Sequence, residues 1–492
     1  MRKRVVVIGA GFSGLSVATS LAQQNFDVTI LEKNSSPGGR ARSFSEDGFT
    51  FDMGPSWYWM PDVFDQYFDT FGKRVADYYE LVRLDPAYTI FFGPGDTLEV
   101  PAQSEHLFAL FERYEPGSSD NLRTFLQEAA YKYQVGMHEF VYKPGLSLLE
   151  FADYRVVSSL FRLQMLTSLA DHVDSLFRHP HLRKLLKFPV LFLGATPENT
   201  PAMYSLMNHA DLVLGTWYPK GGMHQIIRAM VSLAEELGVT IRTHQKVQHI
   251  ITNGRLATEV VTEIQRFDAD IVVAGADYHH VDSTLLSKGA RNYSEAYWDK
   301  QVMAPSSLLF YLGVNKPLDK LLHHNLFFDQ DFRQHAEEIY EEPQWPSNPL
   351  FYVCCASKTD PTCAPPGQEN VFVLIPVAPG LEDTPELRER YYQVVMKRLE
   401  QLTGQSICDA VVYKRSYAHR DFVADYHAFK GNAYGLANTL RQTAILKPSL
   451  KNKKIKNMYY TGQLTVPGPG VPPSLISGIV TAREVVKNHG HQ

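Results

Sequence analysis

The sequence contains little cysteine and no long hydrophobic run. Only four cysteines occur in 492 residues, and none of them belongs to a CxxC pair. This pattern excludes a secreted disulfide framework and gives no support to a zinc ribbon or a redox-active dithiol. We therefore expect reduced, buried thiols, no bound metal and a cytoplasmic location. No window approaches the roughly 18–20 apolar residues that span a bilayer, so the chain is not expected to cross one. The cysteines are Cys354, Cys355, Cys363 and Cys408.

A strong charge imbalance is absent as well. The net charge is −5, with 44% apolar and 21% charged residues, a balance that excludes extensive disorder and argues against a nucleic-acid partner. The length of 492 residues exceeds what one hydrophobic core usually organises, so we expect two or more domains. No GxSxG, kinase or P-loop pattern supports acyl or phosphoryl transfer. The adjacent pairs His279-His280 and His323-His324 lack the i, i+4 spacing with which two histidines of one helix bind a metal.

The N-terminal residues have the pattern of a βαβ unit. Residues 5–8 are a β-branched apolar run typical of a buried parallel strand, residues 15–24 fit a helix, and residues 28–31 fit a second strand. The turn at 9–14 reads Gly-Ala-Gly-Phe-Ser-Gly, and Glu32 ends the second strand. In such units the glycines let the backbone approach a pyrophosphate at the helix N-terminus, and the acid binds ribose hydroxyls. The unit therefore predicts a dinucleotide site.

The βαβ unit alone does not distinguish FAD from NAD, but four later segments add information. Residues 38–40 read Gly-Gly-Arg. The two glycines leave the backbone accessible to a phosphate, and the arginine can donate hydrogen bonds to it from its planar guanidinium. Residues 52–57 form a second turn of small residues that we expect to line a flavin. Residues 270–277 resemble a strand whose small-residue end can pass close to a cofactor. Residues 461–473 precede a predicted last helix, whose N-terminus would stabilise negative charge on a reduced flavin.

The rest of the chain changes pattern along its length. Residues 63–214 have apolar positions mostly at helical spacing. Strand patterns follow, with an Asn-Gly hairpin signal at 253–254 and further runs at 307–314 and 371–377. The proline-rich stretch 341–368 is expected to form loops or a sheet edge. The sequence therefore predicts an α/β protein with a mainly helical region in the middle.

Several motifs together resemble a known family. GAGFSGL, LEKNSSPGGRARS, FDMGPSW and WYPKGGM are similar to the flavin amine oxidase superfamily, and the C-terminal YYTGQLTVPGPGVPPSLISG resembles bacterial-type, carotenoid-forming phytoene desaturases. The resemblance runs from the first strand to the last helix. It departs at Val466, where a histidine is common, and at Pro469 and Pro473, where small residues are usual.

The resemblance implies the fold and the division of the chain into domains. We expect a Rossmann-like FAD-binding domain of the glutathione-reductase/amine-oxidase type, an α+β substrate domain and a helical membrane-contacting insertion. The FAD-binding domain would combine residues 1–70, 218–290 and 431–492. The helical membrane-contacting region would be 71–217, and the substrate domain 291–430.

The resemblance also implies the cofactor site. FAD would be bound non-covalently, with the pyrophosphate at the glycine turn, the ribose at Glu32 and the adenine at the backbone of Val247. No catalytic side chain is identified by the resemblance. The predicted cofactor-binding residues are Gly9, Ala10, Gly11, Phe12, Ser13, Gly14, Glu32, Lys33, Gly39, Arg40, Gly54, Pro55, Ser56, Val247, Gly462, Gly470, Val471 and Pro472.

The activity that the resemblance implies is conversion of phytoene to lycopene by successive dehydrogenations. One carbon would give a hydride to flavin N5 while its neighbour loses a proton, and oxygen or a membrane quinone would take the electrons. An apolar tunnel would hold the C40 carotenoid against the flavin, which is catalysis by positioning. Two alternatives stay open: an amine or porphyrinogen oxidase of the same fold, and a flavin-free isoprenoid-binding escort protein.

An insoluble substrate raises the question of membrane contact. Residues 155–187 combine an apolar stripe at helical spacing with several arginines and lysines, and residues 188–193 add an apolar patch. This composition suits a helix pair inserted shallowly among anionic headgroups. The alternative is an ordinary core-facing helix with a solvated basic face. Guided by the resemblance, we expect peripheral association with the cytoplasmic membrane.

Overall fold

The N-terminal strand lies at the centre of a five-stranded parallel sheet with the order β19-β13-β1-β2-β9. The computed structural model describes residues 2–147, 150, 164–165, 167–193, 196–439 and 442–490. The strands of this sheet are β1 (Arg4–Ile8), β2 (Asp27–Leu31), β9 (Thr240–Arg242), β13 (Ile271–Ala274) and β19 (Met458–Tyr460). Val5 and Val7 of β1 pack into one apolar core, whereas Val6 and Ile8 pack into another. Because both faces are covered, β1 is apolar without alternation.

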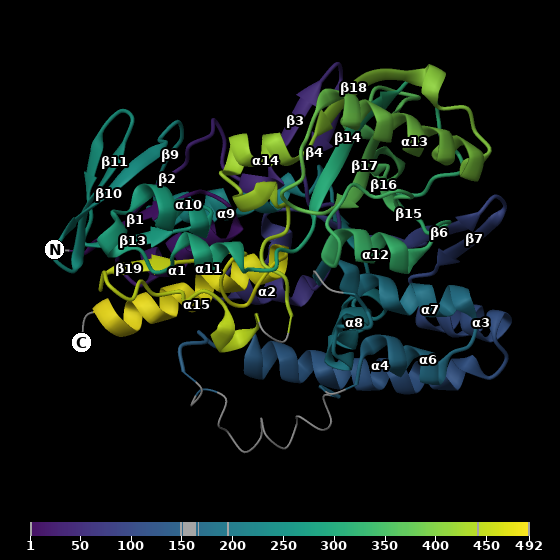
Figure 1. Cartoon of the computed structure of the whole chain (residues 1–492), viewed down its shortest axis with the longest axis horizontal. Helices are drawn as coiled ribbons and strands as arrows, with labels where there is room; N and C mark the ends of the chain where they lie inside the picture. Colours follow the sequence, from purple (N-terminus) through teal and green to yellow (C-terminus); the bar gives the residue numbers. More distant parts are fainter. Residues whose placement is uncertain are drawn as a thin grey trace.

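The first and last helices of the chain pack against each other beside this sheet (Figure 1). The helices on this side are α1 (Phe12–Gln23), α9 (His224–Glu236) and α15 (Val471–His489). Ser16 Oγ donates a hydrogen bond of 2.7 Å to the carbonyl of Leu475. A Cβ at Gly478 would lie 2.6 Å from the carbonyl oxygen of Ser13, so only glycine lets α15 approach α1 this closely. The two ends of the chain therefore form one unit.

A seven-stranded mixed sheet with the order β18-β14-β17-β16-β15-β6-β7 forms the second large element. All neighbouring pairs are antiparallel except β15 and β6. Its strands are β6 (Tyr88–Gly93), β7 (Asp96–Val100), β14 (Ser306–Val314), β15 (His324–Phe327), β16 (Phe351–Cys354), β17 (Glu369–Val377) and β18 (Val411–Tyr417). Helix α13 (Pro385–Thr403) packs on it, sharing an apolar core with β14 and β17 (Figure 1).

Smaller sheets and helices connect these two elements. The remaining strands are β3 (Ser43–Glu46) paired with β4 (Phe49–Asp52), β5 (Leu81–Arg83) paired with β8 (Trp217–Pro219), and the antiparallel β10 (Val247–Asn253), β11 (Leu256–Thr262) and β12 (Arg266–Asp268). Further helices are α2 (Pro61–Asp69), α10 (Tyr278–His280), α11 (Glu295–Asp299), α12 (Phe332–Tyr340) and α14 (His419–Tyr426). The predicted Asn253-Gly254 hairpin is confirmed, because it joins β10 to β11.

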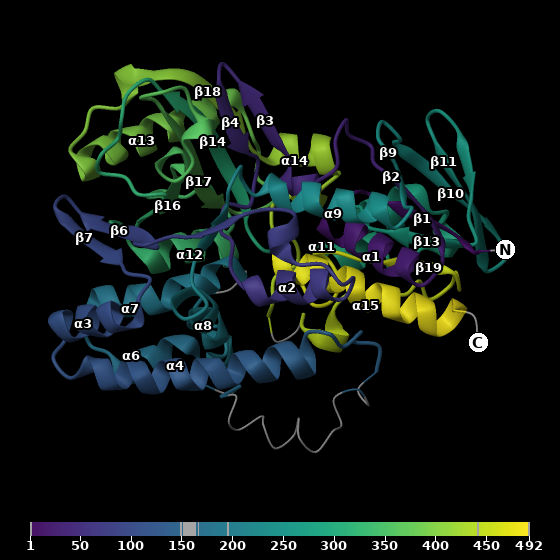
Figure 2. The same cartoon turned by 180° about the vertical axis from the view of Figure 1, so that it is seen from behind.

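A helical layer lies along the other side of the seven-stranded sheet (Figures 1 and 2). It consists of α3 (Ser104–Tyr114), α4 (Ser118–Val135), α6 (Leu169–Leu176), α7 (Pro180–Lys187) and α8 (Leu206–Leu212). Among the described residues, no helix has both the length and the apolar composition that a membrane crossing requires.

Part of the expected membrane-contacting stripe is turned inward. Leu169 and Val173 of α6, and Leu185 and Leu186 of α7, are all fully buried in the main apolar core. The expectation that these side chains contact lipid is therefore wrong, because the protein interior already covers them. The N-terminal part of the stripe, residues 151–163 and 166, lies outside the described residues.

Three further expectations need correction. The proline-rich stretch 341–368 contains β16, a buried strand inside the sheet, because the prolines flank its four residues and leave them free to pair. The region 63–214, expected to be mostly helical, also contributes β6 and β7 to the large sheet. Cys408 is exposed, although the other cysteines are buried as expected.

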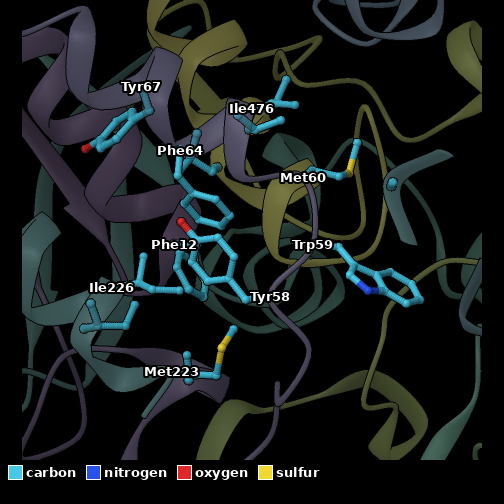
Figure 3. Packing of buried hydrophobic residues seen from close by; sticks show 14 of the residues in the cluster. Phe12, Tyr58, Trp59, Met60, Phe64, Tyr67, Met223, Ile226 and Ile476 are labelled. Atoms are coloured by element: carbon cyan, nitrogen blue, oxygen red, sulfur yellow. The ribbon is translucent and has the colours of Figure 1, made fainter. Parts of the chain in front are cut away.

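Aromatic packing joins α1, α2, α9 and α15 into a common core (Figure 3). Tyr58 and Phe64 lie with ring centroids 4.6 Å apart, and the Tyr58 hydroxyl bonds that of Tyr79 at 2.9 Å. Phe12 of α1 and Ile476 of α15 belong to the same cluster. The turns that begin α1 and α15 are thereby held in a fixed relative position.

The contact between α1 and α15 generates a test of stability. Alanine usually gains roughly 0.5–1 kcal/mol over glycine inside a helix, but overpacking costs roughly 1–3 kcal/mol. We expect Gly478→Ala to destabilise the protein, because its Cβ would meet the backbone of Ser13. Thermal unfolding measures the effect, with Gly289→Ala as the control, since a Cβ there has nothing within 4 Å. Equal melting temperatures of the two variants would contradict the packing argument.

Candidate functional site

The turn between β1 and α1 is built for close approach to a ligand. A Cβ at Gly14 would lie 2.0 Å from the carbonyl oxygen of Gly9, so glycine is needed for α1 to start directly against the strand end. Gly11 is the N-cap of α1, and no side chain caps this helix. The N–H groups of the first helical turn have no partner within a helix, and with the helix dipole they attract an anion.

Glu32 is held at the end of β2 with its carboxylate fixed. It is 5% exposed, and its Oε2 accepts a 2.9 Å bond from the N–H of Ala10, while Oε1 accepts a 2.8 Å bond from the N–H of Asn34. Each carboxylate oxygen keeps a further lone pair. The acid can therefore accept hydrogen bonds from ligand hydroxyls without moving.

Arg40 offers an unused donor to the same region. It lies in the short helical turn Gly39–Ala41, its guanidinium stacks over Tyr426 at 5.0 Å, and one terminal nitrogen donates to the carbonyl of Asn432 at 3.2 Å. Its Nε is buried and has no partner among the described residues. Desolvation lowers the pKa of Arg40, opposed by nearby Asp277. A buried cationic donor without an acceptor fits the phosphate of a dinucleotide.

The C-terminal motif lies beside this glycine turn, since a Cβ at Gly462 would lie 3.1 Å from Ser13 Oγ. The N–H of Gly462 donates to Ser477 Oγ at 2.9 Å, which fixes the loop after β19 to α15. Helix α15 begins at Val471 with Gly470 as its N-cap, and prolines occupy its next two positions. Proline has no N–H group. Of the first three residues of this helix, Val471 alone can therefore donate a backbone hydrogen bond.

These segments surround one cavity of about 540 Å³. All the predicted cofactor-binding residues line it except Ala10 and Gly14, whose backbones lie directly behind the lining. Val247 lines the end beside Glu32 and Lys33. The structure thus gathers residues from the start, middle and end of the chain into a single site. Their individual roles in cofactor binding remain predictions.

Two histidines that the sequence analysis did not assign also line this cavity near its polar end. His280 and His427 stack with 3.9 Å between ring centroids. Burial lowers the pKa of His280 to about 3 and that of His427 to about 4. Both rings are therefore neutral at physiological pH and present an uncharged aromatic surface.

The other end of the cavity is apolar and was missed by the motif search. Its lining comes from the loop before α2, the helical turn that follows α4, and the first residues of α8 with the turn before them, together with β14 and β17 of the large sheet. No local spacing marks these positions, because only tertiary packing brings them together. They are Trp59, Met60, Met137, Val141, Met203, Leu206, Met207, Leu309 and Leu374.

A buried amine lies behind the C-terminal turn. Lys447 is 4% exposed, and its Nζ has no hydrogen-bond partner among the described residues. A Cβ built on Gly468 would lie 3.2 Å from this nitrogen and 2.8 Å from Asn438 Oδ1, so both groups stand beside the turn. Burial lowers the pKa of Lys447 to about 7. The amine therefore carries its charge in only about half of the molecules at pH 7.

Comparison with known proteins agrees with this geometry. The family model described as flavin containing amine oxidoreductase matches residues 12–486. The chain is 42% identical to a carotenoid 3,4-desaturase of Haloarcula japonica over 98% of both chains, and 32% identical to a zeta-carotene-forming phytoene desaturase of Myxococcus xanthus over 99% of this chain and 95% of that one. The structure of an oxidoreductase from Methanosarcina mazei matches with a TM-score of 0.61 and 17% identity, covering 98% of this chain and 100% of that one, which shows the fold alone.

The match to the family model covers nearly the whole chain, and the α/β fold with two large sheets agrees with it. The expectation of FAD is confirmed by this match, and the glycine turn, the fixed Glu32 carboxylate and the unpartnered Arg40 Nε suit the cofactor. The chain belongs to the flavin containing amine oxidoreductase family and is an FAD-dependent oxidoreductase.

Proposed function

We propose that this enzyme is a carotenoid desaturase. It removes one hydrogen from each of two adjacent, singly bonded carbons of a long polyene precursor and so forms a double bond. The observation that carries the proposal is the continuity of one cavity, which runs from the dinucleotide turn to the apolar end. The carotenoid desaturases to which the chain is similar span almost its full length, whereas the solved structure shares only 17% identity and its fold. A hydrocarbon substrate therefore fits better than an amine or a porphyrinogen.

The polar end would hold the cofactor. The α1 N-terminus and Arg40 would bind the diphosphate, Glu32 would bind the ribose, and the turn at Gly462 would lie along the flavin. Bound FAD would supply the redox chemistry by accepting a hydride from one substrate carbon, while the neighbouring carbon loses a proton. The protein contributes to this chemistry by holding the cofactor and the substrate in a fixed relative position, which is catalysis by positioning.

The apolar end would bind and align the substrate. Burial of apolar surface stabilises such a complex by about 25 cal/mol per Å², so a chain of many methyl and methine groups needs no charged anchor. Met60, Met137 and Met207 contribute flexible thioether side chains to the lining. Such side chains adapt to an irregular apolar ligand, and they suit one that must slide between successive positions.

Two finer reactions fit this site. One is the successive dehydrogenation of phytoene to lycopene, which the sequence motifs favour. The second candidate is 3,4-desaturation of an acyclic carotenoid, favoured because the 42% identity to a carotenoid 3,4-desaturase exceeds the 32% identity to a zeta-carotene-forming phytoene desaturase. In either reaction, oxygen or a membrane quinone would take up the electrons. Peripheral contact with a membrane, the source of the substrate, is part of the proposal.

Product analysis distinguishes these reactions. The enzyme is incubated without oxygen with a quinone and liposomes that contain either phytoene or lycopene, and the carotenoids are separated by chromatography. We expect at least one of the two substrates to gain conjugated double bonds. Conversion of phytoene to lycopene supports the first reaction, and conversion of lycopene to a more unsaturated product supports the second. Reduction of the flavin by amines with neither carotenoid changed would contradict the proposal.

The glycine turn generates a test of cofactor binding. A Cβ at Gly11 would meet only the Cα of Gly39, at 4.0 Å, so Gly11→Val has room in the protein itself. Its branched side chain would instead occupy cavity space where we expect the diphosphate. The variant should fold but purify with at least tenfold less FAD per chain than the wild type, about 1.4 kcal/mol or more of lost affinity. Circular dichroism checks folding, and Gly289→Val is the control, since Gly289 is exposed and does not line the cavity. Full FAD content in Gly11→Val would show that the cofactor does not use this turn.

The buried Lys447 generates a test of pH dependence. Its pKa is about 7 in the folded protein but near 10.5 when exposed, so between these values the unfolded chain binds more protons and stability rises with pH. Lys447→Met removes this contribution. The variant should be more stable than the wild type at pH 7, on the order of a few kcal/mol, and the difference should shrink towards pH 10. Denaturant unfolding at several pH values measures it, with the exposed Lys487→Met as the control. A difference that stays constant with pH would contradict this assignment.

A further inference from the structure

A second, much smaller cavity lies behind the wall of the cofactor cavity. Its volume is about 30 Å³, the space of about one water or one metal ion. Ser56 lines both cavities, so one layer of side chains separates them. His323, Cys354 and Cys363 line the small cavity, and Asp52 closes another side. Nitrogen and sulfur ligands therefore converge on a space of ionic size.

The register of two strands creates this cluster. His324 on β15 lies directly opposite Cys354 on β16, and His323 immediately precedes β15. One ligand atom from each of these three residues lies within 4.8 Å of the others. Ligands at the usual bond lengths of about 2.0–2.3 Å around one ion lie roughly 3.4–3.7 Å apart, so the side chains need to close in by only about 1 Å.

Both histidines are oriented as metal ligands are. His323 Nδ1 bonds Thr359 Oγ1 at 2.7 Å, and His324 Nδ1 bonds the hydroxyl of Tyr352 at 2.6 Å. The Tyr352 hydroxyl also bonds Ser56 Oγ at 3.0 Å. With Nδ1 of His324 as the donor to Tyr352, Nε2 of this ring carries the lone pair that a metal ion needs. Such a partner on the second nitrogen fixes the tautomer of a metal-binding histidine.

One ring nitrogen of each histidine has no partner in the part of the protein that the structure describes, and this indicates a bound ligand. Nε2 of His323 and Nε2 of His324 are both buried, and neither has a hydrogen-bond partner among the described residues. Leaving two buried ring nitrogens without a hydrogen-bond partner is unfavourable, and a bound cation would remove this cost.

We propose that His323, His324 and Cys354 bind a thiophilic transition-metal ion, with Zn²⁺ as the probe that fits the ligand set. Two imidazoles and a thiolate are ligands that zinc prefers, and the fourth position falls to Cys363 or a water in the same cavity. Metal binding deprotonates the Cys354 thiol, and the proton goes to solvent. No metal was expected from the sequence, because histidine spacing along one helix does not reveal a ligand set that forms between two strands.

The site would stabilise one wall of the cofactor cavity. The His324 ring stacks on Trp57 with 4.1 Å between centroids and an interplanar angle of 9°, and Trp57 lines that cavity. Tyr352, bonded to His324, lines it as well. An ion on His324 would therefore fix both rings in place. Its role is structural and independent of the reaction assigned to the flavin.

The test uses the flavin-loaded enzyme after treatment with a chelator. Zn²⁺ titration followed by calorimetry should show one equivalent bound per chain, and Zn²⁺ should raise the melting temperature. Co²⁺ should replace it and give a thiolate-to-cobalt charge-transfer band in the near ultraviolet, which reports the sulfur ligand directly. The probe variant is Cys354→Ser, which is nearly isosteric and should bind at least tenfold more weakly and lose the band.

The matched control is Cys355→Ser. Cys355 is the next residue and equally buried, but it packs into the core on the opposite face of the sheet. This variant should keep the metal affinity, the thermal shift and the cobalt band. The bound FAD shows that each variant is folded. No stoichiometric binding by the wild type, or equal loss in both variants, would overturn the proposal. A variant of His323, His323→Gln, gives a second check, because it should also lose the metal while keeping FAD.

Discussion

The structure depends on one contact, the close backbone packing of α15 against α1. A Cβ at Gly478 would lie 2.6 Å from the backbone of Ser13, and a Cβ at Gly14 would lie 2.0 Å from the backbone of Gly9. Backbone therefore packs on backbone from the first strand end, through α1, to the last helix. This contact places the glycine turn and the C-terminal turn side by side in the wall of one cavity, where a Cβ at Gly462 would lie 3.1 Å from Ser13 Oγ. A larger residue at Gly478 or Gly14 would push these two turns apart.

The cavity that results has two chemically different ends. At one end, backbone N–H groups, the Glu32 carboxylate and the Arg40 guanidinium suit a charged, hydroxyl-rich dinucleotide. At the other end, methionines, Trp59 and the apolar strands of the large sheet suit a hydrocarbon. Even the amine behind the C-terminal turn, Lys447, is held with a lowered pKa. The arrangement keeps charge with the cofactor and away from the substrate.

What the sequence predicted was the part of the site that is local. The spacing of Gly9, Gly11 and Gly14 and the acid at Glu32 follow from the geometry of a single βαβ unit, so the motif alone located them. The apolar lining could not be found this way, since Met137 and Leu309 meet only after helices and sheet have packed. Strand β16 was hidden by flanking prolines, and the inward face of α7 resembled a membrane-binding face because amphipathic periodicity does not say what covers it. The His323, His324 and Cys354 cluster depends on strand register, which no spacing along the chain reveals.

One cavity is expected to hold FAD between the two ends of the chain, and a crystal structure of the yellow, flavin-loaded enzyme would show whether it does. We expect the diphosphate at the N-terminus of α1, the ribose on Glu32, the adenine beside Val247 and the ring system between Gly462 and Val471, with its open face towards Met137 and Leu309. A dinucleotide bound elsewhere, or a flavin ring with both faces closed off from the apolar end, would show that the cavity does not bring cofactor and substrate together.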